Sequence, residues 1–281
     1  MHCELTCCFL LLTIARNAHL NSEPTEKQTA TTVLFEYPLQ ENIRTFMRLE
    51  YLFKQFRRNS LASNADNHLY CLKVLFEILE ILERGDSRSE LIKELSRLLD
   101  YFKALEANPE VDSSKLANFL KQIKQLHQWI HAYAGKFGES LRKSPFIVAV
   151  KQRTNIPGGS CQFDCPELHL FLSRPHQQRQ NQLTSMVEDI KGVETSVEVI
   201  LRLIRDTGQW SLQKAPMGSF MIETTDRTFK LLRIKTTIEG ELFPEFSCGK
   251  HRSSVHFMTF NERHKKMPVQ KEIEFELACC F

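Results

Sequence analysis

The hydrophobic period of this sequence changes along the chain, from a helical repeat to a strand repeat. Between residues 41 and 135 apolar residues recur every three or four positions, whereas after Gly208 they alternate with polar ones. Helices that come first and strands that come last are typical of the α+β class, because each element type then forms its own layer. We therefore predict an α+β protein with an N-terminal helical bundle domain and a C-terminal antiparallel β-sheet domain.

Four apolar stripes predict the helices of the bundle, and they run through Ile43–Phe53, Leu69–Leu82, Leu91–Leu105 and Leu116–Ile130. Polar residues and glycine mark the helix ends. Gly85 is expected to end the second helix in a left-handed turn. Ser87 and Glu90 are expected to begin the third helix as a capping box, and Asp112 or Ser113 to cap the fourth. Two further helices are predicted over 176–191 and 193–206.

The least generic stretch is Lys151–Leu172, between the bundle and the sheet. Pro157 and Gly158 predict a type II turn, because proline presets the first dihedral angle and glycine accepts the positive second one. Pro166 fits the first turn of a short helix. Cys161, Cys165 and His169 could be zinc ligands, but their spacing differs from that of common structural sites, and small buried cysteines are the alternative. We predict no metal.

Strict alternation predicts strands after Gly208. In His251–Phe260 and Glu272–Leu277 the inward set is expected to be Ser253, Val255, Phe257, Ile273, Phe275 and Leu277, and the outward set Arg252, Ser254, His256, Glu272, Glu274 and Glu276. Phe229–Ile238 is also rich in strand-forming residues. The sheet is therefore expected to expose charged and polar side chains on one face.

The domain boundaries follow from these patterns. Residues 1–32 are interpreted as a flexible, dispensable overhang, 33–206 as a mainly helical domain, and 207–281 as the β-domain, with 33–38 as a candidate strand of the β-domain. Cys7–Ala15 is an apolar run of signal-peptide size, but no lysine or arginine precedes it. An export signal is the alternative interpretation of that run.

Composition excludes several classes of protein. A net charge of +3, from 37 basic and 34 acidic residues, is too small for a dedicated nucleic-acid binder. Nine cysteines without regular spacing argue against a secreted disulfide framework and favour the reducing cytoplasm. The chain lacks the G-x-S-x-G, H-E-x-x-H and phosphate-loop signatures. We expect no enzymatic activity, no cofactor and no membrane span.

Positive charge is concentrated in the segment 248–271. It carries Lys250, Arg252, Arg263, Lys265, Lys266 and Lys271, but one acidic residue, Glu262. This surface could bind an acidic peptide. Two alternatives stay open: the cations could pair with the glutamates of 272–276 in a cross-strand ladder, or the segment could form a nucleic-acid-binding module.

Several motifs resemble the ZapD family, which are FtsZ-associated cell division factors of Gram-negative bacteria. In chain order they are VLFEYPL at Val33–Leu39, IRTFMRLEYL at Ile43–Leu52, ERG at Glu83–Gly85, ELIKEL at Glu90–Leu95, QRTNIPGGSCQFDCPELHLFL at Gln152–Leu172 and FELACC at Phe275–Cys280. The resemblance covers nearly all of the chain after residue 32. It implies a non-enzymatic homodimer in the cytoplasm that binds the C-terminal tail of FtsZ and bundles FtsZ protofilaments, which promotes Z-ring assembly at the mid-cell septum.

The resemblance also implies which side chains bind the FtsZ tail. The basic residues of the family correspond to Arg84 and Arg252, and neighbouring Lys250 is added from the basic segment. For Arg84, a role in complementing the helix dipole is the alternative. A third family arginine is replaced by His256, whose charge depends on pH near neutrality.

Overall fold

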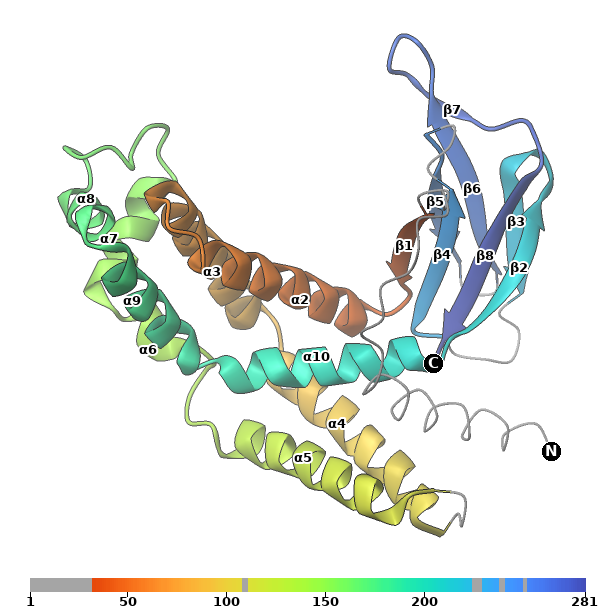
Figure 1. The fold of residues 1–281 in the computed structure, drawn as a ribbon, viewed down its shortest axis with the longest axis horizontal. Helices are drawn as coiled ribbons and strands as arrows, with labels where there is room; N and C mark the ends of the chain where they lie inside the picture. The colour runs from red at the N-terminus through yellow and green to blue at the C-terminus, as the bar shows by residue number, and fades with distance from the viewer. Residues whose placement is uncertain (1–31, 108–110, 224–228, 238–240, 250–251) are drawn as a thin grey trace, which may run out of the picture. The chain divides into compact units, whose positions relative to one another are not determined.

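The computed structural model describes residues 32–107, 111–223, 229–237, 241–249 and 252–281. Figure 1 shows helices in the N-terminal part of the chain and antiparallel strands in the C-terminal part, which confirms the α+β class. The chain divides into two compact units. The helical unit is Thr45–Ile200, and the β unit combines the residues up to Arg44 with Leu201–Phe281.

The helical unit is built mainly from long helices. Its elements, with two helices that continue into the β unit, are α2 (Glu41–Ser60), α3 (Ala65–Arg84), α4 (Ser87–Ala104), η1 (Leu105–Ala107), α5 (Ser113–Ala132), α6 (Glu139–Arg142), α7 (Pro145–Thr154), α8 (Pro166–Ser173), α9 (His176–Glu188) and α10 (Lys191–Asp206). The predicted apolar stripes are buried, including Phe46, Leu72, Leu95 and Ile123. In α5, Trp129 packs against Gly192 of α10, where an added Cβ would lie 2.3 Å from its ring.

Two of the predicted helix ends are wrong in detail. Gly85 has φ −106° and ψ 163°, which is extended and not left-handed. The cap of α4 is Asp86, whose carboxylate accepts a hydrogen bond from the Ser89 amide, because a carboxylate one residue earlier takes the place of Ser87. Asp112 caps α5 as predicted, and its hydrogen bonds from Ser114 and Lys115 lower its pKa to about 2.

The turn between α7 and α8 is confirmed. Gly158 has φ +72°, and the Gly159 amide donates to the carbonyl oxygen of Ile156 at 2.9 Å. Position 159 has no room for a side chain, because a Cβ there would lie 2.2 Å from the carbonyl oxygen of Arg153. The next helix begins at Pro166, as the sequence predicts.

The β unit contains two antiparallel sheets. One has the order β1-β4-β8-β2, and the other has the order β3-β6-β5 with β7 paired to β6. Their bounds are β1 Thr32–Pro38, β2 Gln209–Ala215, β3 Ser219–Glu223, β4 Leu231–Thr237, β5 Phe243–Cys248, β6 Arg252–Phe260, β7 Lys266–Pro268 and β8 Ile273–Cys280. The strand expected near residue 33 is β1, which pairs with β4.

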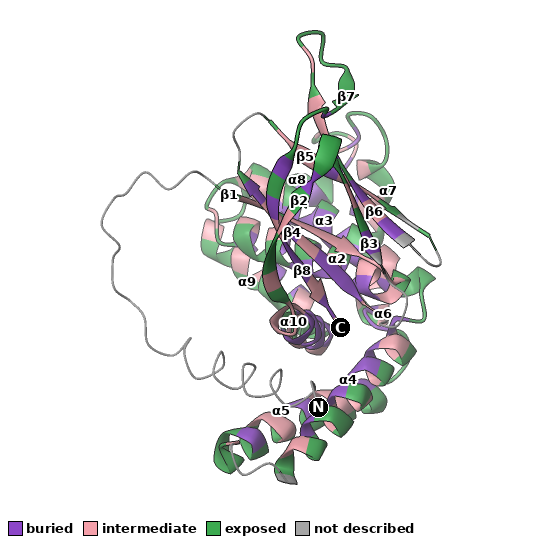
Figure 2. Cartoon of the chain, turned by 90° about the vertical axis from the view of Figure 1, so that its right-hand side faces the viewer, coloured by how far each residue is buried: buried purple, intermediate pink, exposed green. Residues whose placement is uncertain are grey.

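The inner faces of the two sheets share one apolar core, drawn in purple in Figure 2. Phe257 of β6 lies 5.0 Å from Phe275 of β8, ring centre to ring centre. Val255 and Ile234 are fully buried in the same cluster. Burial therefore follows the predicted alternation, and the odd-numbered residues of β6 and β8 point into the core.

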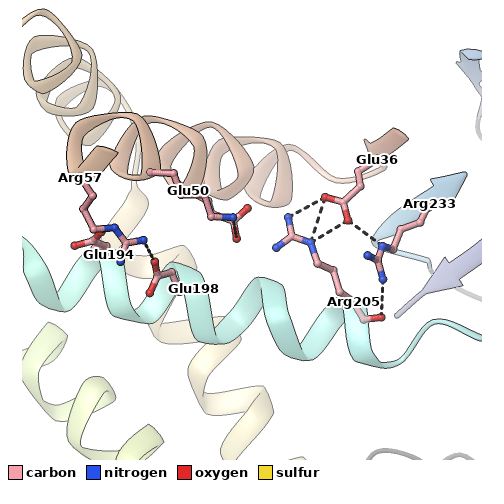
Figure 3. A network of polar contacts seen from close by, with 8 residues as sticks. Glu36, Glu50, Arg57, Glu194, Glu198, Arg205 and Arg233 are labelled. Carbon is pink, nitrogen blue, oxygen red and sulfur yellow. Dashed lines mark hydrogen bonds and ion pairs between the residues drawn. The ribbon is translucent and has the colours of Figure 1, made fainter. Parts of the chain in front are cut away.

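Ion pairs join helix to strand within the β unit. Glu36 of β1 accepts a hydrogen bond from Arg205 of α10 at 2.9 Å and forms an ion pair with Arg233 of β4 at 2.9 Å, and Figure 3 shows its carboxylate between them. All three side chains are less than a fifth exposed. The guanidinium of Arg233 also lies 5.2 Å from the ring of Trp210 on β2, and Lys235 lies 3.8 Å from it. These contacts cover one face of the first sheet with a polar layer.

A second group of ion pairs lies in the helical unit (Figure 3). Arg57 of α2 contacts Glu194 of α10 at 3.0 Å and also pairs with Glu198. Burial raises the pKa of Glu194. Arg57 therefore joins one turn of α10, between Glu194 and Glu198, to the C-terminal half of α2.

Candidate partner-binding surface

The outer face of the β3-β6-β5 sheet carries His256, one of the predicted site residues. Ser253, Val255 and Phe257 are buried, whereas His256 is exposed and Ser254 is half-buried. Arg252, where only the backbone is described, begins β6 in register with this outer set. Arg252 and His256 therefore stand four positions apart on one strand, at alternating positions of the same register, about 13 Å from each other by strand rise.

His256 lies at the centre of this face among hydroxyl groups. Its Nδ1 is 3.1 Å from the Ser219 hydroxyl on β3, and its Nε2 is 3.1 Å from the Ser254 hydroxyl. The backbone register puts Ser219 and Glu245 directly opposite it on the two neighbouring strands. The imidazole is thus held by two hydrogen bonds within a polar strip.

The remaining cations of the basic segment follow β6. Arg263, Lys265, Lys266 and Lys271 are exposed, and Lys266 forms an ion pair with Glu245 of β5. Lys250 lies outside the described residues, so its predicted role stays a prediction.

The cross-strand ladder involving the basic segment is wrong for the described side chains. Lys214 of β2 contacts Glu272 at 3.3 Å and Glu274 at 2.9 Å, and hydrogen bonds to Glu274 and Glu272 raise its pKa. Lys235 of β4 contacts Glu276 at 3.3 Å. Because β8 pairs with β2 and β4, these glutamates contact cations of β2 and β4.

Arg84 lies in the helical unit, in the last turn of α3. It pairs with Glu80 one turn earlier, and its side chain is 79% exposed. A cation in this position complements the negative end of the helix dipole. The same exposure leaves the guanidinium accessible to a partner, so both interpretations stay open.

The cysteine segment shows packing and turn contacts. Cys165 is buried, and the Cys161 thiol lies 3.5 Å from Asp164. Across the described ranges no group of three His, Cys, Asp or Glu side chains is arranged to hold a metal ion. Burial raises the pKa of the Cys71 and Cys280 thiols to about 12, which suppresses their nucleophilic thiolate forms. No helix within the described residues is long and apolar enough to cross a membrane.

The comparisons with known proteins agree on one family. A family model described as "ZapD: Cell division protein" matches residues 47–256. The chain belongs to the ZapD family. The cell division protein ZapD of Azoarcus sp. is 32% identical over 248 residues, which cover 88% of this chain and 99% of that protein. The ZapD of Pectobacterium atrosepticum is 34% identical over 251 residues, 89% of this chain and 98% of the relative.

ZapD of Cronobacter sakazakii is also similar, at 33% identity over 250 residues. Family membership gives the chain a role in cell division, and this is not a family of known enzymes.

The structure also brings together two aromatic residues of the outer face that were not predicted from the sequence. Phe243 of β5 and Phe260 of β6 stack ring on ring. The alternation of β6 could have indicated Phe260, because it continues the outward even-numbered set.

Proposed function

We propose that this chain is a non-enzymatic cell division factor that binds the C-terminal tail of FtsZ through the outer face of the β3-β6-β5 sheet. As a homodimer in the cytoplasm it would present two such faces, cross-link FtsZ protofilaments and promote Z-ring assembly at the mid-cell septum. Two weak contacts on one dimer become strong along a polymer through effective concentration.

The observation that supports the proposal is that Arg252 begins β6, four positions before exposed His256 on the same strand, in a chain of the ZapD family. Between Arg252 and Lys271 the sequence carries five lysines and arginines and one acidic residue, and although Glu245 of β5 pairs with Lys266, the excess of cations favours an anionic ligand. The glutamates of β8, which could have neutralised it, pair with Lys214 and Lys235 instead.

Co-sedimentation with polymerised FtsZ, with and without its C-terminal tail, tests the proposal. A charge-assisted contact is worth about 1.5–3 kcal/mol, so Arg252→Glu should weaken tail binding at least about tenfold. Added salt should weaken wild-type bundling, because exposed charges are screened. Lys121→Glu, the same charge reversal at an exposed position of α5, is the matched control.

Arg252→Glu should keep the wild-type melting temperature while bundling is lost. Sedimentation that is equal with tail-less FtsZ would refute tail binding. An Arg252→Glu protein that melts early but still bundles FtsZ would show that this residue serves the fold.

A further inference from the structure

The outer face of β6 does not end at His256. The even-numbered residues continue to Met258 and Phe260, and the neighbouring strands place Phe243 opposite Met258 and Lys266 opposite Phe260. From Arg252 to Phe260 the face is about 26 Å long by strand rise. This length matches an extended peptide of about eight residues.

Phe260 and Phe243 form an apolar step at the far end of this face. Their ring centres lie 5.1 Å apart with the planes inclined at 30°, as expected for diagonal neighbours on adjacent strands. Phe260 nevertheless remains 48% exposed. Met221, opposite Ser254 near the start of β6, is 57% exposed on the same face. Large apolar side chains thus flank the polar centre on both sides.

The hairpin between β6 and β7 extends this face with positive charge. Its tip carries Arg263, His264 and Lys265, all exposed. The Asn261 side-chain oxygen accepts from the backbone amides of Arg263 at 3.0 Å and Lys265 at 2.9 Å, and the Asn261 amide donates to the Lys265 carbonyl oxygen at 3.0 Å. These hydrogen bonds restrain the backbone of the tip, and such a restraint reduces the entropy lost on binding.

We propose that the FtsZ-tail site extends along β6 to the Phe243–Phe260 pair and the hairpin cations Arg263 and Lys265. The ligand is an extended peptide that places a large apolar side chain on the aromatic pair and a carboxylate against the hairpin. This inference rests on the proposed function and adds a specificity subsite to it, because Arg252 alone would accept any anion. The aromatic pair makes the site select for an apolar residue at a fixed spacing from the acidic one.

A peptide fits these observations better than a membrane or a nucleic acid. The hairpin tip carries charged residues, while Phe260 lies at the base of the hairpin on a sheet face, whereas insertion into a bilayer needs apolar side chains at the tip. The rings of Phe243 and Phe260 cover part of each other, whereas stacking of successive bases needs open ring faces.

The test is fluorescence anisotropy with a labelled FtsZ tail peptide. Phe260→Ser and Lys265→Glu should each weaken the peptide at least about tenfold, as truncation of an interface anchor or reversal of a contacting charge does. Leu212→Ser is the matched control for the apolar change. Leu212 is 68% exposed on β2, which belongs to the other sheet. The Leu212→Ser protein should bind the peptide as the wild type does.

The outcomes separate the two proposals. If the wild type fails to bind the peptide, the proposed function falls, and this subsite falls with it. If Arg252→Glu weakens binding but Phe260→Ser and Lys265→Glu do not, the function stands and the extended subsite is overturned. Anionic vesicles and duplex DNA serve as competing probes: if Lys265→Glu abolishes binding to one of them and leaves peptide affinity unchanged, the hairpin belongs to that ligand. Equal melting temperatures exclude misfolding of the variants.

Discussion

Arg179 of α9 is a buried arginine whose hydrogen bonds connect several elements of the helical unit. Its side chain is 7% exposed and donates to the carbonyl oxygens of Ser63 at 2.7 Å and Leu172 at 3.2 Å, and also to that of Arg174. Its Nε donates to Nδ1 of His68 on α3 at 2.9 Å. One guanidinium therefore joins the loop after α2, the helix α3 and the end of α8. We predict that Arg179→Met destabilises this unit strongly.

The magnitude follows from the hydrogen bonds that the substitution removes. Hydrogen bonds to a charged group are worth about 1.5–3 kcal/mol each, but they are not additive, and the carbonyl groups can partly recover water. Removing one partner of a buried charged network costs about 3–5 kcal/mol. For a unit of this size that lowers the melting temperature by about 6–20 °C. Methionine keeps an apolar side chain of similar length, so the loss of stability measures the contribution of the guanidinium group.

The same hydrogen bond gives the prediction a pH signature. His68 is fully buried, its Nε2 lies 3.3 Å from the Ser60 carbonyl oxygen, and Nδ1 must stay unprotonated to accept from Arg179. Burial first, and then the charge of Arg179, lower the pKa of His68, and His176 stacked on it at 5.6 Å acts in the same direction. The unfolded chain therefore binds the proton first. Stability is complete above the unfolded pKa of about 6.5 and declines as the pH falls below it.

Removal of Arg179 removes one cause of this lowering, so Arg179→Met should lose less stability on acidification than the wild type. Urea unfolding followed by circular dichroism at about pH 7.5 and pH 5.5 measures both effects. Arg174→Met is the matched control, since the Arg174 side chain is exposed and donates to half-buried Gln182. A free energy of unfolding for Arg179→Met within about 1 kcal/mol of Arg174→Met, or an equal pH slope in all three proteins, would refute the reasoning.

Two further predictions concern other parts of the chain. Glu36→Gln removes the carboxylate shared by Arg205 and Arg233 and should cost about 3–5 kcal/mol in urea unfolding of the β unit; a loss below about 1 kcal/mol would show that the arginines find other partners. Gly159→Ala should lower the melting temperature more than Gly158→Ala. A Cβ at position 159 would lie 2.2 Å from a backbone oxygen, whereas a Cβ at position 158 has open space, so that only its positive φ destabilises the variant. The reverse order would contradict this account of the turn.

Much of the fold could be predicted because it depends on local pattern. The alternation of β6 places Val255 and Phe257 inside, and the proline and glycine rules locate the turn at Gly158 and the start of α8 at Pro166. The error at the α4 cap has a local cause too, since Asp86 and Ser87 are adjacent residues that can both cap a helix.

What could not be predicted depends on long-range pairing. Lys214 reaches Glu272 only because β2 pairs with β8, and no local periodicity specifies that neighbour. His68 and Arg179 lie 111 residues apart in the sequence. The place of Arg252 in the alternating pattern followed from its own strand, but the contact between Phe243 and Phe260 requires the β5-β6 register.

The tryptophans offer a way to observe the two units separately. The sequence contains two, and the division of the chain gives Trp129 to the helical unit and Trp210 to the β unit. Trp129 packs on Gly192, whereas Trp210 lies against two cations. Replacing either tryptophan with phenylalanine leaves the remaining tryptophan as the only source of tryptophan fluorescence. Two single-tryptophan proteins would therefore resolve whether the units unfold in one transition or in two, and which of them responds when a tail peptide binds.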